Sequence, residues 1–443
     1  MKQTALSPDD SRKIPCLAGK DLTGRHLTVT VPGSKSITNR ALLLATLADG
    51  VSTLRGALFS DDSRSFLKCI QDLGFAAYAD EETKCITVTG LGGRPPVDTA
   101  SVYVGSAGTA ARFLTAYLGA CEGVWHLDAS PQMRRRPMAP LLDSLQRLGC
   151  EVSCGDKPGF FPFTLRSRGF QSGRISVNIA DSSQFLSALL ISACLSGHTM
   201  EIETKGTHGM AYIDMTCRMM EQFGIHTEIT RTPETVFTVP AGQACRALDY
   251  QIEPDLSAAC YFYAMAAVLG ISVTVRHVSS SSMQGDLRFL DVLVRMGCIR
   301  RETPEGICIT GPAGGRLKGV SVDMSSFSDQ AITLAAIAPF ADSPTVITGI
   351  GHIRFQESDR IRAIVTQLSG MGIRCEESRD SITVYPGTPS AHAVDTYEDH
   401  RMAMGFSLTG LRVPGIRIRN PQCCGKTFEN YFDVLDACVA ECL

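Results

Sequence analysis

Apolar and polar positions repeat along this chain with a period of about 75 residues. Five amphipathic stretches, each with apolar residues three and four apart, end in glycine, which predicts five helices with glycine C-caps. The glycines are Gly74, Gly149, Gly224, Gly297 and Gly372, and by subtraction they lie 75, 75, 73 and 75 residues apart. A short strand pair is predicted after each. We interpret the pattern as six copies of a βαβαββ unit, the last ending in a helix that reaches residue 443.

A second series of helices, shorter and more apolar, runs in phase with the first. These helices are predicted at 41–47, 110–118, 184–195, 257–269, 330–338 and 402–411. They are apolar on most faces, as helices buried inside a protein are. One unit cannot cover both faces of its own helices, so the copies are expected to pack on one another, within two or three domains.

Composition and charge narrow the class of partner. The chain is 44% hydrophobic and 20% charged with a net charge of −3, so no nucleic-acid or membrane partner is expected. No apolar run approaches the roughly 18 residues of a membrane span. Residues 1–20 are polar and are predicted to be a loose extension without a signal-peptide core. The 17 cysteines include no Cys-x-x-Cys pair, which favours reduced thiols in a cytoplasmic protein and no metal site.

The turn at residues 32–40 carries the first candidate chemistry and reads Pro-Gly-Ser-Lys-Ser-Ile-Thr-Asn-Arg. An alternating, β-branched run at 27–31 predicts a strand before it, and an apolar helix follows. The first turn of a helix has unsatisfied backbone N–H groups and about half a positive charge. With Lys35 and Arg40 beside that helix end, the turn predicts an anion site. An ordinary capped helix with solvated charges is the other interpretation of this turn alone.

Other polar clusters stand at helix starts or in the segments between helices. They include the Gly108 turn with Arg112, Arg136 before Pro137 at a predicted helix start, the run Ser182-Ser183-Gln184, Asp329, Glu357 within an Arg-rich stretch, His400-Arg401, and Lys426. Each cluster by itself also fits a helix cap or exposed ion pairs. Five of the clusters share one phase in the repeat, the start of the short helix. Six such helix ends facing one space would form a cleft that gathers helix dipoles, cations and a few acids. The ligand should then carry several negative charges.

Seven of these segments, taken in order, resemble 5-enolpyruvylshikimate-3-phosphate synthases. The segments are Pro-Gly-Ser-Lys-Ser-x-x-Asn-Arg, Gly-x-Ala-Gly-Thr, Arg-Pro-Met, Ser-Ser-Gln-Phe, Gln-Glu-Ser-Asp-Arg, Asp-His-Arg-Met-Ala-Met and Lys-Thr-Phe. The resemblance implies a two-domain inside-out α/β barrel with three βαβαββ repeats per domain and the active site between the domains. Residues 1–33 and 254–443 would form one domain, and the inserted residues 34–253 the other. The resemblance also implies a monomer without cofactor or metal.

The resemblance further implies transfer of the enolpyruvyl group of phosphoenolpyruvate to the 5-hydroxyl of shikimate 3-phosphate. Asp329 would take the hydroxyl proton, Glu357 would move the proton at C3, and Lys35 would assist at the phosphate. The positions that match the family's contacts to shikimate 3-phosphate are Lys35, Ser36, Arg40, Ser182, Ser183, Gln184, Tyr212, Asp329 and Gln356. Those that match its contacts to phosphoenolpyruvate are Lys35, Gly108, Arg136, Gln184, Arg360, Arg401 and Lys426. Inhibition by glyphosate at the phosphoenolpyruvate site is a further expectation.

Four positions depart from the family pattern. Ser106 stands where Asn is usual, Phe113 where Pro is usual, Gln356 where Lys is common, and Gly209 where a Ser often holds the shikimate phosphate. Losing that Lys and Ser should weaken phosphate binding unless neighbouring groups compensate.

Two alternatives of different kinds stay open at this point. The related transferase acting on UDP-N-acetylglucosamine has Cys or Asp where this chain has Pro131, and Lys-Asn where it has Lys35-Ser36. Both differences argue against that acceptor. The other alternative is a non-catalytic anion-binding protein of the same fold. Two carboxylates beside phosphates add nothing to binding alone, so Asp329 and Glu357 argue against it.

Overall fold

The computed structural model describes residues 11–155, 157–207, 209–231 and 233–443. Contacts divide the chain into two units. The discontinuous unit comprises residues 1–32 and 254–443, and the inserted unit comprises residues 33–253. Gly33 thus belongs to the inserted unit, one residue away from the boundary that we expected from the sequence.

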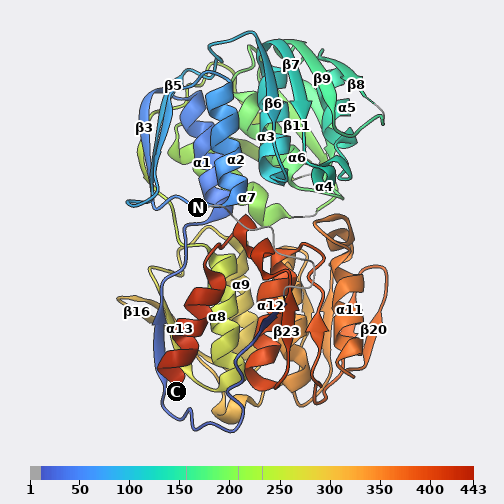
Figure 1. The fold of residues 1–443 in the computed structure, drawn as a ribbon. Coiled ribbons are helices and arrows are strands. Elements are labelled where there is room, and N and C mark those ends of the chain that lie inside the picture. The colour runs from blue at the N-terminus through green and yellow to red at the C-terminus, as the bar shows by residue number, and fades with distance from the viewer. Residues whose placement is uncertain (1–10, 156, 208, 232) are drawn as a thin grey trace. The chain divides into compact units, whose positions relative to one another are not determined.

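The inserted unit alternates strands and helices through three repeats (Figure 1). Its elements are α1 (Lys35–Leu47), β3 (Asp49–Arg55), α2 (Asp61–Asp72), β4 (Ala77–Asp80), β5 (Cys85–Leu91), β6 (Thr99–Tyr103), α3 (Gly108–Ala120), β7 (Glu122–Asp128), α4 (Pro131–Arg134), α5 (Ala139–Arg147), β8 (Glu151–Cys154), β9 (Phe163–Arg168), β10 (Arg174–Asn178), α6 (Gln184–Ala193), β11 (Met200–Lys205), α7 (Met210–Gln222), β12 (Glu228–Arg231), β13 (Thr235–Val239) and β14 (Asp249–Gln251).

The discontinuous unit repeats the same order with more 3₁₀ turns, labelled η. Its elements are β1 (Ser11–Lys13), β2 (His26–Val29), α8 (Leu256–Leu269), β15 (Ser272–Arg276), η1 (Gly285–Leu287), α9 (Arg288–Arg295), β16 (Ile299–Thr303), β17 (Gly306–Thr310), η2 (Ala313–Gly315), β18 (Ser321–Asp323), η3 (Ser328–Gln330), α10 (Ala331–Ile337), η4 (Ala338–Phe340), β19 (Thr345–Thr348), η5 (Gly351–Phe355), α11 (Arg360–Gly370), β20 (Cys375–Glu377), β21 (Ile382–Val384), β22 (Ala393–Val394), α12 (His400–Arg412), β23 (Arg417–Arg419), η6 (Pro421–Lys426) and α13 (Tyr431–Cys442).

Sheet topology confirms the βαβαββ repeat. Within the described residues five four-stranded sheets share one pattern, with orders β14-β3-β5-β4, β6-β7-β9-β8, β10-β11-β13-β12, β2-β15-β17-β16 and β18-β19-β21-β20. In each sheet the first two strands are parallel and the others antiparallel. Helical crossovers require parallel neighbours and short turns allow antiparallel ones, so the pattern follows from the element order. The sixth sheet, β22-β23-β1, has three strands.

In two sheets the first strand is distant in sequence from the other three, because the inserted unit interrupts the discontinuous one. Strand β2 precedes the inserted unit but pairs with β15, with Leu27 opposite Val273. Strand β14 ends the inserted unit and pairs with β3, with Tyr250 opposite Leu54. Each pairing closes a repeat of its own unit, and in this way the insertion leaves both units complete.

The two series of helices occupy the places that the periodicity predicts. Gly74, Gly149, Gly224, Gly297 and Gly372 follow α2, α5, α7, α9 and α11, and all have φ between 82° and 105°. That left-handed region favours glycine, so the prediction of glycine C-caps is confirmed. The second series corresponds to α1, α3, α6, α8, α10 and α12, which are almost entirely buried.

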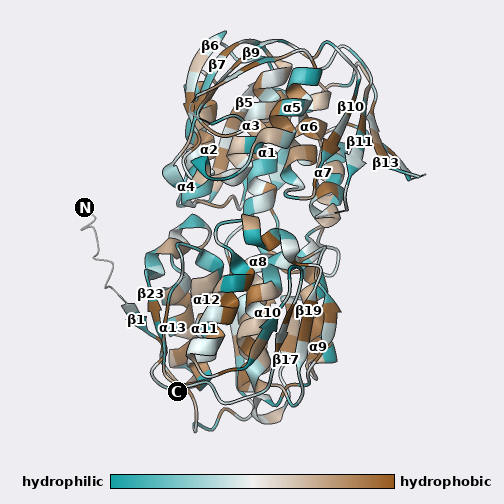
Figure 2. Ribbon diagram, turned by 90° about the vertical axis from the view of Figure 1, so that its right-hand side faces the viewer, coloured by the Kyte–Doolittle hydropathy of each residue, from teal (hydrophilic) through white to brown (hydrophobic). Residues whose placement is uncertain are grey.

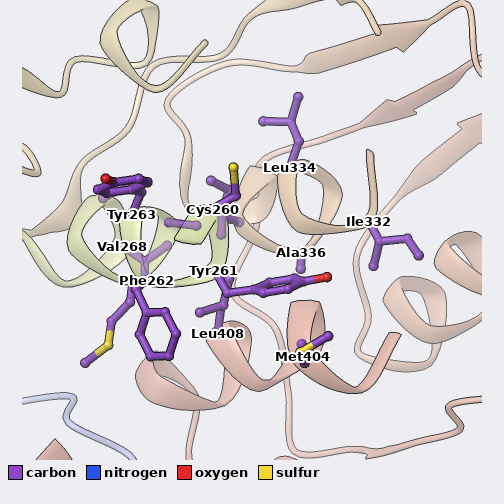
Figure 3. Packing of buried hydrophobic residues seen from close by; sticks show 14 of the residues in the cluster. Cys260, Tyr261, Phe262, Tyr263, Val268, Ile332, Leu334, Ala336, Met404 and Leu408 are labelled. Carbon is purple, nitrogen blue, oxygen red and sulfur yellow. The ribbon is translucent and has the colours of Figure 1, made fainter. Parts of the chain in front are cut away.

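Many residues of these helices are hydrophobic (Figure 2), and their buried side chains form the core of each unit. In the discontinuous unit, Figure 3 shows Tyr261 extending from α8 toward Met404 of α12. Burying side chains of this size contributes about 1.5–3 kcal/mol each. Polar residues at the helix starts lie at the ends of this apolar packing, which holds their backbone in place. No helix among the described residues is long and apolar enough to cross a membrane.

Part of the N-terminal segment is ordered, which corrects the prediction of a loose extension. Strand β1 pairs antiparallel with β23, and Ile14 and Leu17 are buried at 1% and 2% exposure. Their apolar side chains stabilise the pairing, whereas the polar composition of the segment had indicated the opposite. Residues 1–10 of the predicted extension lie outside the described residues.

Candidate active site

In the inserted unit a buried arginine lies among neutral partners. Arg40 on α1 is 3% exposed. Its Nε donates to Thr216 Oγ1 at 2.8 Å, and its terminal nitrogens donate to the carbonyls of Ser36 at 2.9 Å and Tyr212 at 3.2 Å. Burial lowers the pKa of Arg40 to about 10. No carboxylate in the described part of the chain pairs with this guanidinium, so an anionic ligand would supply the missing countercharge.

A second cation, Lys35, stands in the first turn of α1. Its Nζ lies 3.5 Å from Oδ2 of Asp62, a buried carboxylate at the start of α2. An ion pair of this kind holds the ammonium group near the helix N-terminus, where an anion is also favoured.

Glycine at the start of α3 lets two arginine side chains approach the backbone closely. A Cβ added at Gly108 would lie 2.6 Å from a terminal nitrogen of Arg136 and 3.0 Å from one of Arg112. Arg112 is held by the carbonyls of Gly108 and Pro137. Gln184 at the start of α6 reaches Thr109 Oγ1 at 3.5 Å. The structure therefore brings Gly108, Arg136 and Gln184 of the prediction into one part of the inserted unit.

Gly209 is required by its backbone and by its neighbour. It caps α7 with φ 65°, and an added Cβ would lie 2.5 Å from Ser183 Oγ. A serine side chain at this position would collide with Ser183, which itself presents a hydroxyl there. Where the family often has a serine, this chain has Gly209 together with the hydroxyl of Ser183 from the start of α6.

In the discontinuous unit one buried arginine joins three carboxylates. Arg360, 1% exposed, donates from Nε to Asp399 at 2.8 Å, and from its terminal nitrogens to Asp329 at 3.1 Å and Glu357 at 2.9 Å. Burial lowers the pKa of Arg360, but attraction to the three carboxylates outweighs burial and raises it above its usual value.

Two more cations complete this cluster. Arg401 on α12 donates to Asp329 Oδ2 at 2.6 Å, and Lys426 in η6 lies 3.3 Å from Glu357 Oε1. Gln356, which stands where the family commonly has Lys, accepts a hydrogen bond from Arg360. All six predicted residues of this unit, namely Asp329, Gln356, Glu357, Arg360, Arg401 and Lys426, therefore lie in one network. We call the network, together with Asp399, the carboxylate cluster.

Asp399 is a residue of the cluster that sequence reasoning did not select. It is completely buried, caps α12 through the backbone N–H of Arg401 at 3.0 Å, and accepts from Ser358 at 3.1 Å. Its place directly before His400-Arg401 at a predicted helix start was an available signal. Asp62 had a similar signal, because it lies in the first turn of α2, which Ser60 caps. Thr216 had none, since it stands inside a helix.

Asp286 is a further buried acid of this unit. Ser257 donates a hydrogen bond to its Oδ2. Burial, and next the negative charge of Asp329, raise the pKa of Asp286 to about 7. A carboxyl group with this pKa holds a proton well above the pH at which an ordinary aspartate ionises.

The stretch that leads to Arg136 contains a short helix, and the helix predicted to start at Pro137 starts later. Residues 131–134 form α4, because Ser130 caps it and Pro131 suits its first turn. The next helix, α5, begins at Ala139, two residues after Pro137. Arg136 lies between these helices, as expected.

Comparisons with known proteins identify the class. An EPSP synthase structure from Acinetobacter baumannii has a TM-score of 0.77 at 23% identity and covers 96% of this chain and 97% of its own. The enolpyruvyl transferase NikO from Streptomyces tendae has a TM-score of 0.74 at 18% identity, with the same coverage. At these identities the likeness concerns the fold alone, which is the two-domain inside-out α/β fold of enolpyruvyl transferases.

Sequence comparison gives the family. The family model described as EPSP synthase (3-phosphoshikimate 1-carboxyvinyltransferase) matches residues 18–435. A 3-phosphoshikimate 1-carboxyvinyltransferase of Trichormus variabilis is 45% identical over 406 residues, which is 91% of this chain and 94% of the relative. A second relative, from Halalkalibacterium halodurans, is 39% identical over 414 residues, which is 92% of this chain and 91% of the relative. The chain belongs to the EPSP synthase family and is a transferase.

Proposed function

We propose that this chain transfers the enolpyruvyl group of phosphoenolpyruvate to the 5-hydroxyl of shikimate 3-phosphate, releasing phosphate. Family membership supports this acceptor over UDP-N-acetylglucosamine. The observation that carries the chemistry is Arg360, which holds Asp329 and Glu357 at 3.1 and 2.9 Å. Two acids on one guanidinium, with Arg401 and Lys426 beside them, suit proton transfer next to phosphates.

In the addition step Asp329 takes the proton of the 5-hydroxyl, and the oxygen of that hydroxyl group bonds to C2 of phosphoenolpyruvate. Glu357 gives a proton to C3, and a tetrahedral ketal forms. In the elimination step Glu357 takes a proton back from C3, and the C2–O bond to phosphate breaks. The proton held by Asp329 goes to the departing phosphate, so both acids return to their starting states. Lys35 offsets charge on the phosphate oxygens.

The inserted unit supplies the remaining contacts in this proposal. Arg40, with Ser36, Ser182, Ser183, Gln184 and Tyr212, would bind shikimate 3-phosphate, and Gly108 with Arg136 would bind phosphoenolpyruvate. The buried guanidinium of Arg40 without a carboxylate partner supports this assignment. Glyphosate would then compete with phosphoenolpyruvate. A monomeric state and a cytoplasmic location complete the proposal.

The test is phosphate release from phosphoenolpyruvate, run with shikimate 3-phosphate and, separately, with UDP-N-acetylglucosamine. We expect release with the shikimate compound only, and loss of release in Asp329→Ala and Glu357→Gln. Glu377→Gln is the matched control for Glu357→Gln, because Glu377 also pairs with two cationic side chains, Arg354 and Arg362, outside the carboxylate cluster. Release with the nucleotide sugar alone would overturn the acceptor, and no release with bound substrates would leave an anion-binding protein.

A further inference from the structure

Arg40 is held by hydroxyls and carbonyls rather than by charge. Three of its five N–H groups reach Thr216, Ser36 and Tyr212 within 3.2 Å, and a fourth lies 3.5 Å from Ser187 Oγ. The fifth, on the nitrogen that donates to Ser36, has no acceptor among the described residues. An arginine side chain has many rotamers, so the direction of its guanidinium depends on these neutral partners.

Thr216 is the partner that ties the others together. Its hydroxyl accepts from Arg40 Nε at 2.8 Å and lies 2.7 Å from the carbonyl of Tyr212 and 3.0 Å from Ser187 Oγ. These contacts join α1, α6 and α7, the helices whose starts carry the predicted ligands of shikimate 3-phosphate. Thr216 and Ser187 are completely buried, so water does not compete for the hydroxyl.

An aromatic ring limits the remaining freedom of the guanidinium. The Cζ of Arg40 lies 5.3 Å from the ring centroid of Phe113 on α3. A buried cation at this distance from an aromatic face is attracted to it. The ring of Phe113 thus lies beside the guanidinium, while Thr216 accepts from its Nε.

We propose that Thr216 is a positioning residue for shikimate 3-phosphate, acting through Arg40. Its hydroxyl sets the direction of the guanidinium so that the fifth N–H faces an anionic group of the ligand. The inference rests on the proposed function, in which Arg40 binds shikimate 3-phosphate. Thr216 touches no substrate in this scheme, so it should affect binding of one substrate and leave the chemical step alone.

The experiment compares Thr216→Ser with Thr216→Cys, which differ only in oxygen against sulfur. Serine keeps the hydroxyl, whereas a thiol is a weak acceptor for Arg40. We expect the KM for shikimate 3-phosphate to rise about 10-fold or more in the Cys variant, the size of one lost hydrogen bond to a charged group. In the Cys variant, kcat and the KM for phosphoenolpyruvate should stay within about threefold of the unmodified protein. The Ser variant should keep the KM of the unmodified protein for shikimate 3-phosphate.

Thr46→Val is the matched control. Thr46, on α1, is buried like Thr216, but its hydroxyl bonds only carbonyls of its own helix. It should leave the KM for shikimate 3-phosphate unchanged. Equal KM values in the Ser and Cys variants, or equal effects of Thr216→Cys and Thr46→Val, would overturn the inference. Calorimetric binding of shikimate 3-phosphate to the unmodified protein separates the two proposals, since its absence would refute the proposed function instead.

Discussion

Replacing Asp399 with asparagine should destabilise the discontinuous unit strongly. Asp399 is completely buried and pairs with Arg360, which is 1% exposed. Removing one charge of a buried pair costs about 3–5 kcal/mol. Arg360 keeps Asp329 and Glu357 as partners, so we expect about 3 kcal/mol, at the lower end of that range. For a unit of 150–250 residues this corresponds to a Tm lower by roughly 6–12 °C.

Asp359→Asn is the matched control for this prediction. Asp359 also caps a helix, α11, through the N–H of Arg362, and also pairs with an arginine, Arg354. Its side chain is 44% exposed, so its ion pair should contribute about 0.2–1 kcal/mol. Asparagine caps a helix about as well as aspartate, so the cap contribution cancels in both variants.

The single tryptophan makes the measurement specific to one unit. Trp125 lies buried in β7 of the inserted unit, so its fluorescence reports unfolding there. Circular dichroism reports both units. In Asp399→Asn we expect an earlier transition by circular dichroism and a smaller shift by fluorescence. Equal, small losses of stability in Asp399→Asn and Asp359→Asn would refute the argument that burial makes the Asp399 pair decisive.

Three further predictions concern pH, backbone strain and substrate binding. Because burial and Asp329 raise the pKa of Asp286 to about 7, the folded protein binds more protons than the unfolded chain between about pH 4 and 7. Stability should therefore fall as pH rises through that window, and Asp286→Asn should flatten this part of the profile measured by urea unfolding. Glu398 has φ 59°, so Glu398→Asn should raise the unfolding free energy by up to about 1 kcal/mol, whereas a loss would contradict the strain. Gly108→Ala should displace Arg136 and raise the KM for phosphoenolpyruvate by about 10- to 100-fold; an unchanged KM would show that the arginine is not needed there.

Much of the fold could be predicted because its signals are local. Glycine C-caps and apolar helices repeat every 75 residues or so, and each is decided by the dihedral angles and burial of neighbouring residues. The pairing of strands could not be predicted in the same way. Leu54 and Tyr250 are 196 residues apart by subtraction, and the sequence of neither strand specifies its pairing partner.

The site shows the same division. Lys35, Arg40 and Ser182 could be selected because they stand at helix starts, where anions bind. Thr216 lies inside α7 and resembles any other buried threonine. Its contact with Arg40 depends on how α1 and α7 pack, which involves residues 176 apart.

The amino-acid sequence by itself determined the six repeats, the positions of the helix starts and the polar residues that they carry. These properties depend on short stretches of chain, in which a period of 3.6 or 2 residues sets the face of each side chain. Only the tertiary structure decided that β14 completes the first repeat, that Arg40 lacks a carboxylate, and that Asp399 supports Arg360. Charge pairing and strand pairing require that distant segments meet, and such meetings are fixed by the packing of the apolar core rather than by local pattern.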